Sequence, residues 1–292
     1  MNIKRSGIIV SIPAGRYVTY LSFLSLIWMF AMAVDTASES NPIYQVQWQT
    51  GGIISELDIN GITIDKSSSK FSGTGSAPLN KWLKPGRNVV TIRLRPLPES
   101  DNSGSYKVSL ARAQAGQYVD EGEKVFEFSW ESGKSKDKLP IEKKIDFTPQ
   151  SAPALDLWTK AELITLDAGT EKSIRSFLKT LSNAYIKADA DKIAKLQEFK
   201  ANEISRAFGG KAMSMPEIKN ETKDYLSMLE SDEAKFAPID TEGAKLQLVA
   251  ENRLVLVTAK NGAPLLIAKS ASDEYVVEIY LARINGKWVV AR

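Results

Sequence analysis

The pattern of apolar and polar residues changes about half-way along the chain. From residue 44 to residue 147, short runs alternate apolar and polar residues, as half-buried β-strands do. Turn-forming residues separate these runs at intervals of roughly 8–12 residues. The clearest is Asn60-Gly61, the dipeptide typical of a tight hairpin. The pattern predicts an all-β sandwich over residues 44–147.

The second half of the chain begins with helical periodicity. Apolar residues from 174 to 188 recur on one helix face: Ile174, Phe177, Leu178, Leu181, Tyr185 and Ala188. Thr170 is the expected N-cap of this helix, and either Asp189 or Asp191 caps a second helix. A third helix begins with Pro216 at its first position.

Strands are expected to complete this half. Their predicted ranges are 244–250, 253–260, 264–271, 275–284 and 287–291, with Asn285-Gly286 turning into the last. Residues 148–159 are predicted to be a linker that begins with TPQSAP, and residues 155–166 are predicted to be extended. The fold class is therefore mixed: an all-β N-terminal domain (44–147) followed by an α+β domain (160–292).

Two resemblances refine this organisation. The corner Leu83-Lys84-Pro85-Gly86-Arg87-Asn88 resembles a recurring element of galactose-binding-like jelly rolls. Pro85 fixes φ there, Gly86 accepts a positive φ, and Leu83 packs beneath. This resemblance implies a jelly-roll-like architecture and no ligand-binding residue.

The second resemblance concerns the C-terminal half. Three helices, a break at Lys187–Asp191 and a final meander with Tyr280, Asn285-Gly286-Lys287-Trp288 and Val290 are similar to the NTF2-like (SnoaL-type) fold. The resemblance implies a curved sheet around a conical pocket. Members that depend on histidine chemistry cannot serve as a guide, because this chain has no histidine.

Composition excludes several kinds of chemistry. The 292 residues include neither cysteine nor histidine. Disulfides, thiolate nucleophiles, Cys/His zinc sites and histidine-based triads are therefore impossible. No motif indicates a catalytic residue, a metal site or a cofactor.

The N-terminus predicts export. Lys4, Arg5 and Arg16 precede an apolar run over residues 18–34, and Ala31-Met32-Ala33 fits a cleavage site. We expect residues 1–33 to be a signal peptide and the protein to be periplasmic or secreted. The alternative is an inner-membrane anchor formed by residues 18–34, with the rest facing the periplasm. These three cations account for the net charge of +3, so the remaining chain is neutral and has no basic face for nucleic acid.

Three residues are candidates for ligand binding. Trp82 lies beside the jelly-roll corner and could stack on a sugar ring. Glu278 and Tyr280 share a strand face that could line the conical pocket, where burial would raise the pKa of the glutamate.

These features predict an exported bacterial cell-envelope protein that binds or assembles and performs no chemistry. Its ligand would be a glycan, an envelope component or a protein partner. The sequence leaves open whether the protein forms a homo-oligomer. One alternative is a histidine-free hydrolase that uses carboxylates such as Glu278. Another is a periplasmic inhibitor or immunity-type protein.

Overall fold

The computed structural model describes residues 41–68, 70–98, 104–114, 117 and 119–292. These residues form two compact units, residues 42–152 (unit 1) and residues 153–292 (unit 2). The expected signal peptide, residues 1–33, and the apolar run 18–34 lie outside the described residues. Within the described ranges, no helix is both long enough and apolar enough to cross a membrane.

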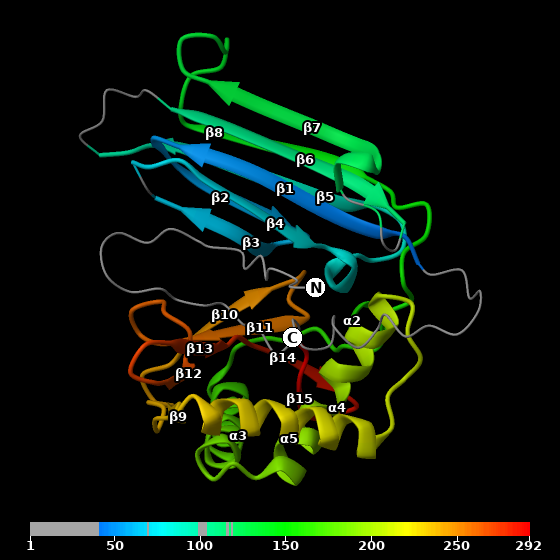
Figure 1. The fold of residues 1–292 in the computed structure, drawn as a ribbon, viewed down its shortest axis with the longest axis vertical. Helices are drawn as coiled ribbons and strands as arrows, with labels where there is room; N and C mark the ends of the chain where they lie inside the picture. The colour runs from blue at the N-terminus through cyan, green and yellow to red at the C-terminus, as the bar shows by residue number, and fades with distance from the viewer. Residues whose placement is uncertain (1–40, 69, 99–103, 115–116, 118) are drawn as a thin grey trace, which may run out of the picture. The chain divides into compact units, whose positions relative to one another are not determined.

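Unit 1 contains two four-stranded antiparallel sheets (Figure 1). Sheet 1 has the order β4 (Gly73–Pro78), β1 (Ile43–Gly51), β6 (Ser105–Ala113) and β7 (Glu123–Glu131). Sheet 2 has the order β3 (Ile62–Ser67), β2 (Ile53–Ile59), β5 (Asn88–Pro96) and β8 (Ile141–Phe147). Two 3-10 turns, η1 (Asn80–Trp82) and η2 (Val119–Glu121), lie in the connections.

The alternating sequence pattern explains these sheets. On β1, Val46 is buried while Gln47 and Gln49 are exposed, because successive side chains of a strand point to opposite faces. The buried rows of both sheets form the core of unit 1. The turn between β2 and β3 is the predicted Asn60-Gly61, with φ of 51° and 78°.

The corner before β5 has the expected local geometry. Gly86 has a φ of 80°, and Leu83 is fully buried. The buried side chain of Asn88 holds the corner together. Its Oδ1 accepts from the backbone N–H of Lys84 (3.0 Å), and its Nδ2 donates to the carbonyl oxygens of Lys84 and Gly86 (both 2.9 Å). The corner sequence therefore encodes a self-supporting turn.

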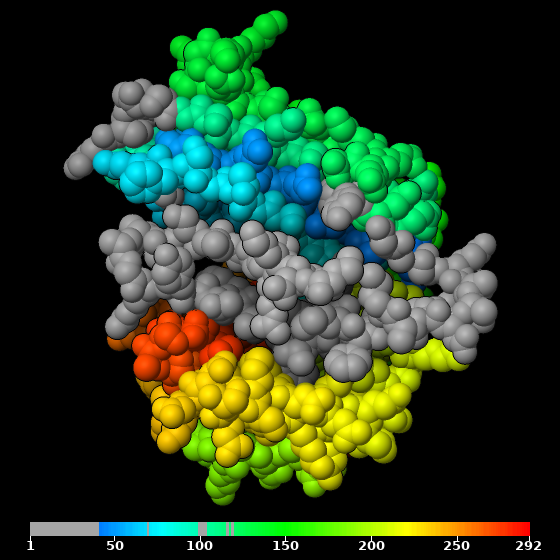
Figure 2. All heavy atoms as spheres, viewed as in Figure 1, coloured from blue at the N-terminus to red at the C-terminus, as the bar shows by residue number. Residues whose placement is uncertain are grey.

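One edge of each sheet in unit 1 is formed by one of two strands that follow each other in the chain. Strand β7 ends sheet 1, and β8 ends sheet 2. The loop of residues 132–140 that joins them projects from the unit, as the green protrusion in Figure 2 shows.

Unit 2 begins with four helices: α2 (Asp156–Thr159), α3 (Ala168–Ile186), α4 (Ala190–Ala207) and α5 (Met215–Ser231). The N-cap of α3 is Asp167, whose carboxylate accepts from the Thr170 N–H at 2.7 Å. The prediction of Thr170 as the cap was wrong, because a carboxylate three residues earlier satisfies the free N–H groups.

Two further helix starts can be compared with the sequence. Asp189 caps α4 through the Lys192 N–H, which settles the choice between Asp189 and Asp191. Ser214 caps α5, so Pro216 is the second helical residue and not the first.

Residues 155–166 differ from their prediction. Residues 156–159 form α2, and only the stretch after it is extended, where Ala161 forms an isolated bridge with Ile284. Glu203 and Arg206 of α4 form hydrogen bonds with this short helix, and the local sequence does not indicate these contacts.

Two antiparallel sheets complete unit 2. One has the order β10 (Lys245–Val249), β11 (Leu254–Thr258), β14 (Ile279–Ile284) and β15 (Lys287–Val290). The other has the order β13 (Glu274–Val277), β12 (Leu266–Lys269) and β9 (Lys235–Phe236). The single strand predicted over 275–284 is thus two strands in two sheets, and the break falls at Glu278.

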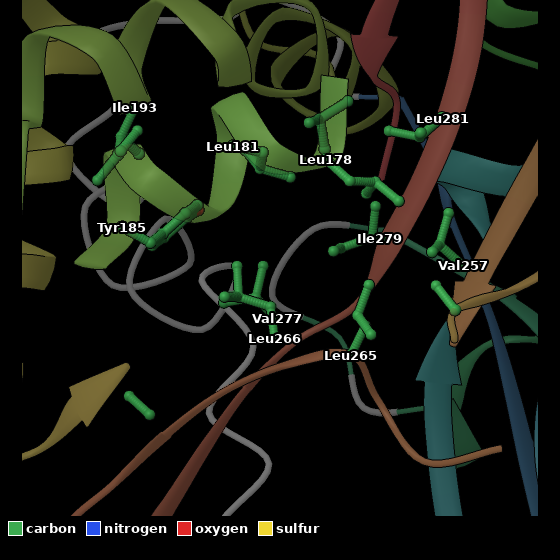
Figure 3. Packing of buried hydrophobic residues seen from close by; sticks show 14 of the residues in the cluster. Leu178, Leu181, Tyr185, Ile193, Val257, Leu265, Leu266, Val277, Ile279 and Leu281 are labelled. Atoms are coloured by element: carbon green, nitrogen blue, oxygen red, sulfur yellow. The ribbon is translucent and has the colours of Figure 1, made fainter. Parts of the chain in front are cut away.

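The core of unit 2 lies between α3 and these sheets (Figure 3). Leu178 and Leu181 of α3 meet Ile279 and Leu281 of β14, and all four are at most 1% exposed. Large apolar side chains therefore fill this part of the interior of unit 2. As a whole the described chain is a β-rich mixed fold of antiparallel sheets with helices, and this coarse fold class is confirmed.

Candidate functional site

A polar face covers the outside of sheet 1. Antiparallel pairing aligns Gln47 of β1 with Ser76 of β4 and Ser109 of β6. Two residues further along, Gln49 is aligned with Thr74 and Lys107. Because aligned residues point to the same face, these side chains form two rows of amide, hydroxyl and amine groups across three strands.

The same residues surround a hollow of about 550 Å³. Its lining is Gln47, Trp48, Gln49, Thr74, Gly75, Ser76, Lys107 and Ser109. We call this surface the sheet 1 hollow. Side-chain amides and hydroxyls both donate and accept hydrogen bonds, so they suit a ligand that carries many hydroxyl groups.

One carboxylate partly offsets the charge in the sheet 1 hollow. The only charged residue in its lining is Lys107, whose Nζ lies 3.5 Å from a carboxylate oxygen of Glu127. Lys124 also contacts Glu127, at 3.1 Å. The hydrogen bond from Lys124 and the charges of both lysines lower the pKa of Glu127. Glu127 therefore offsets part of the positive charge of Lys107, the one charged residue in the lining.

A partly buried polar pair, Trp48 and Asp65, lies on the other side of the same strands. The Trp48 indole donates a hydrogen bond to the carboxylate of Asp65 on β3. Its ring occupies the space that a side chain at Gly75 would need, so glycine is required there. Burial raises the pKa of Asp65 to about 6, against the lowering effect of the hydrogen bonds from Trp48 and the Lys66 backbone.

Asp65 is incompletely satisfied. Among the residues that the structure describes, neither its Oδ2 nor the hydroxyl of Tyr106 has a hydrogen-bond partner, although both atoms are buried. The charge of Asp65 and burial together raise the pKa of Tyr106, burial being the larger cause. Trp48 thus connects the strands beneath the sheet 1 hollow to a carboxyl group that can change its charge near pH 6.

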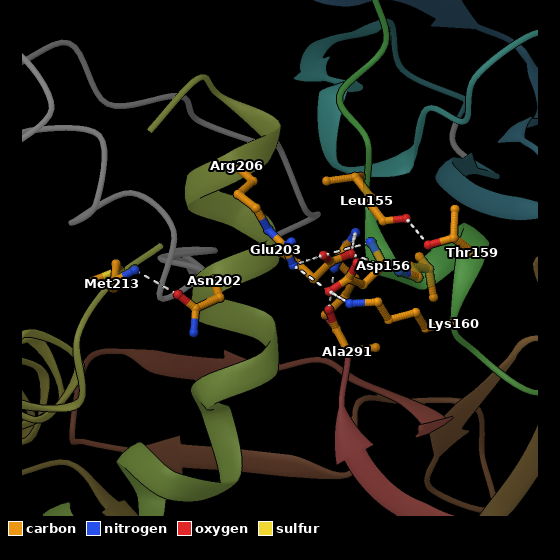
Figure 4. Close-up of polar contacts among 11 residues, drawn as sticks. Leu155, Asp156, Thr159, Lys160, Asn202, Glu203, Arg206, Met213 and Ala291 are labelled. Atoms are coloured by element: carbon orange, nitrogen blue, oxygen red, sulfur yellow. Dashed lines mark hydrogen bonds and ion pairs between the residues drawn. The ribbon is translucent and has the colours of Figure 1, made fainter. Parts of the chain in front are cut away.

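Unit 2 holds a second polar cluster, drawn in Figure 4. Glu203 of α4 is fully buried and accepts from the N–H groups of Asp156 and Leu157, both at 3.0 Å. Arg206 donates to Glu203 at 2.6 Å and to Asp156 at 3.0 Å. The buried Arg292 guanidinium lies 3.6 Å from the other oxygen of Glu203. Each oxygen of this carboxylate is matched by donors, so the cluster joins α2, α4 and residue 292 structurally.

The sequence-predicted candidates fall in different places. Trp82, in unit 1, is 4% exposed, so its ring faces are covered and Lys81 Nζ lies 5.1 Å from the ring centroid. Tyr280, in unit 2, is also 4% exposed and is not part of the core cluster that Ile279 and Leu281 enter. Neither residue contributes to the sheet 1 hollow.

Glu278 lies at the break between β13 and β14 and is exposed. The burial expected for Glu278 is not found, because its neighbours Val277 and Ile279 are the residues that enter the core cluster. The premise of a carboxylate-dependent hydrolase at Glu278 is therefore not met.

Sequence reasoning missed the residues of the sheet 1 hollow. Their signal was present in the polar positions of YQVQWQ and SYKVSL, which alternate with buried residues. What the sequence does not show is that β1 lies beside both β4 and β6, which brings the polar side chains of the three strands together. In the described part of the chain, no group of three or more acidic side chains is placed to hold a metal ion.

Comparisons with protein-family models, with curated proteins and with solved structures found no match to this chain.

Proposed function

We propose that this chain is an exported binding protein of the bacterial cell envelope that holds a neutral, hydroxyl-rich ligand, such as a glycan, in the sheet 1 hollow. The observation that carries this proposal is the hollow itself: about 550 Å³ lined by two glutamines, a threonine, two serines and one charge-offset lysine. The amide and hydroxyl side chains can both donate hydrogen bonds to sugar hydroxyls and accept them, and the ammonium of Lys107 can donate them.

The proposal includes a finer description of both units. We infer a jelly-roll-like β-sandwich for unit 1, supported by the two sheets and the Leu83–Asn88 corner. For unit 2 we infer an NTF2-like α+β domain, supported by three long helices followed by antiparallel strands. Export, by a cleaved signal over residues 1–33 or an anchor over 18–34, rests on the sequence pattern.

The test is binding of defined neutral polysaccharides to the full-length protein, followed by substitution in the hollow. Gln47→Ala with Gln49→Ala removes two amides from the centre of the surface. We expect this pair to weaken binding at least tenfold, since each lost hydrogen bond is worth about 1 kcal/mol.

The matched control is Gln247→Ala, which removes an exposed strand glutamine from β10 in unit 2. The control should bind as the unsubstituted protein does. Equal binding by the double variant, with circular dichroism showing an intact fold, would place the ligand elsewhere and overturn the proposal.

A further inference from the structure

The β7–β8 side of unit 1 exposes part of the core. Pairing with β5 aligns Ile141, Lys143 and Ile145 of β8 with Leu94, Ile92 and Val90. The three β5 residues are at most 1% exposed and face the interior. The three β8 residues therefore lie on the core-facing side of sheet 2, yet the isoleucines are only half-buried and Lys143 is exposed.

The facing strand has the same character. Phe126 and Phe128 of β7 are aligned with the buried Leu110 and Val108 of β6, so they also point to the interior. Both phenylalanines are only half-buried. Since β7 and β8 each have one strand neighbour in the described sheets, nothing in those sheets extends the core beyond them. We call Phe126, Phe128, Ile141 and Ile145 the open edge.

Lys143 places one positive charge in the middle of the open edge. The nearby acids have other partners: Glu142 contacts Arg93 (3.1 Å) and Lys144 (3.3 Å), and Glu131 contacts Lys134 (2.8 Å). Among the described residues, no carboxylate pairs with Lys143. In the projecting loop, Lys136 and Lys138 are likewise unpaired and outnumber the one unpaired acid, Asp137.

We propose that the open edge binds a single-chain anionic amphiphile, with its hydrocarbon chain along the half-buried phenylalanines and isoleucines and its negatively charged head at Lys143. The hydrocarbon covers apolar surface that is now partly in water, and removing this surface from water stabilises the complex. The head group pairs with an ammonium that has no other partner, and the excess of lysines in the loop attracts the same charge.

A different role for Lys143 makes a contrasting prediction. An inward-pointing lysine on an edge strand can simply prevent two copies from pairing edge to edge. In that case its removal would cause self-association, and the edge would bind no amphiphile. The two roles can therefore be separated by one set of measurements.

The experiment titrates monomeric dodecanoate at pH 8 into the full-length protein by calorimetry, with dodecyltrimethylammonium as the oppositely charged probe. Dodecanoate should bind and the cationic probe should bind at least tenfold more weakly. Lys143→Gln should weaken dodecanoate binding about tenfold, the effect of losing one charge-assisted contact. Lys144→Gln is the matched control, because this neighbour points to the other face and is paired with Glu142.

Phe128→Ser tests the hydrocarbon contact, and circular dichroism shows whether this variant folds. If it does not fold, the charge comparison between the two lysine variants decides by itself. Equal binding of both probes, equal effects of Lys143→Gln and Lys144→Gln, or self-association of Lys143→Gln without dodecanoate binding would each overturn the proposal. Binding only to phosphatidylglycerol vesicles and not to monomeric dodecanoate would also overturn it.

Discussion

Glu203 in unit 2 and the partly buried Asp65 in unit 1 both lose hydration when the chain folds, and their surroundings differ strongly. Glu203 in unit 2 accepts two backbone N–H groups and faces two guanidinium groups. Asp65 in unit 1 accepts from an indole and one backbone N–H and leaves one oxygen without a partner among the described residues. Both oxygens of the carboxylate therefore have hydrogen-bond donors in one unit, whereas one oxygen lacks a donor in the other.

The difference shows how donors decide the cost of burying charge. Taking a carboxylate out of water costs several kcal/mol unless hydrogen bonds and opposite charges replace the lost hydration. Around Glu203 these replacements extend to its neighbours: hydrogen bonds from Lys160 and Arg206 lower the pKa of Asp156 even though burial opposes this. Burial also lowers the pKa of Arg292, an effect that Glu203 partly offsets. Among the described residues, no cation lowers the pKa of Asp65, so burial is the largest effect and favours its neutral form.

The largest expected effect follows from breaking the Glu203 cluster. Glu203→Gln leaves the buried Arg292 without its carboxylate and weakens both bonds to α2. We expect unit 2 to lose about 3–5 kcal/mol of unfolding free energy, the usual consequence of leaving a buried charge unpaired. Urea unfolding followed by circular dichroism measures this.

The control for that prediction lies on the same helix. Glu198 of α4 is exposed, so Glu198→Gln should change the stability of unit 2 by less than about 0.5 kcal/mol. A loss below about 1 kcal/mol for Glu203→Gln would mean that the cluster does not hold α2 as the structure suggests.

A smaller effect, of opposite sign, is expected for Asp65→Asn. The folded-state pKa of Asp65, about 6, lies above its ordinary value of 3.8, so folding favours the protonated form. The stability that this group contributes is complete below about pH 4 and is lost as the pH rises through 6. Asparagine stays neutral and can still accept from Trp48.

The comparison is the difference in unfolding free energy between variant and unsubstituted protein across pH. Asp65→Asn should be near neutral at pH 4 and should stabilise unit 1 by about 2 kcal/mol at pH 8, a two-unit shift reduced for partial exposure. In the unsubstituted protein the fluorescence of Trp48 should change with pH near 6, and this change should be absent in Asp65→Asn. A difference that does not change between pH 4 and pH 8 would contradict the raised pKa.

The two carboxylates also mark what sequence could and could not predict. The β-rich first half, the three long helices of the second half and the Asn60-Gly61 and Asn285-Gly286 turns follow from local patterns, and the positive φ angles at both turns agree. The position of Asp65 does not follow, because strict alternation along β3 would place it outside. A register shift between β2 and β3 at Leu57/Asp58 aligns Asp65 with the buried Leu57 and turns it inward.

Glu203 was missed for a different reason. It lies on the buried side of α4, seven residues after Leu196, so a carboxylate on an apolar face was visible in the sequence. Its partners were not visible: they come from α2, which was predicted to be extended, and from Arg292, which is 89 residues away. The sheet 1 hollow has the same origin, since it depends on which strands become neighbours.

The smallest expected effect comes from a comparison of two buried tyrosines. It tests whether the hydroxyl of Tyr106 lacks a hydrogen-bond partner in solution. The hydroxyl of Tyr106 beside Asp65 has no partner in the described chain, whereas that of Tyr185 accepts from Gln197 Nε2 at 2.9 Å. Tyr106→Phe removes a buried hydroxyl that gains nothing, so unit 1 should be unchanged or stabilised by about 0.5–1 kcal/mol. Tyr185→Phe leaves the amide of Gln197 without its acceptor, so unit 2 should lose about 1–2 kcal/mol.

Thermal unfolding of both variants measures the two signs in one protein. If Tyr106→Phe destabilises as much as Tyr185→Phe does, the hydroxyl of Tyr106 has a partner in solution, and the contrast between the two buried carboxylates would be smaller than their hydrogen bonds indicate.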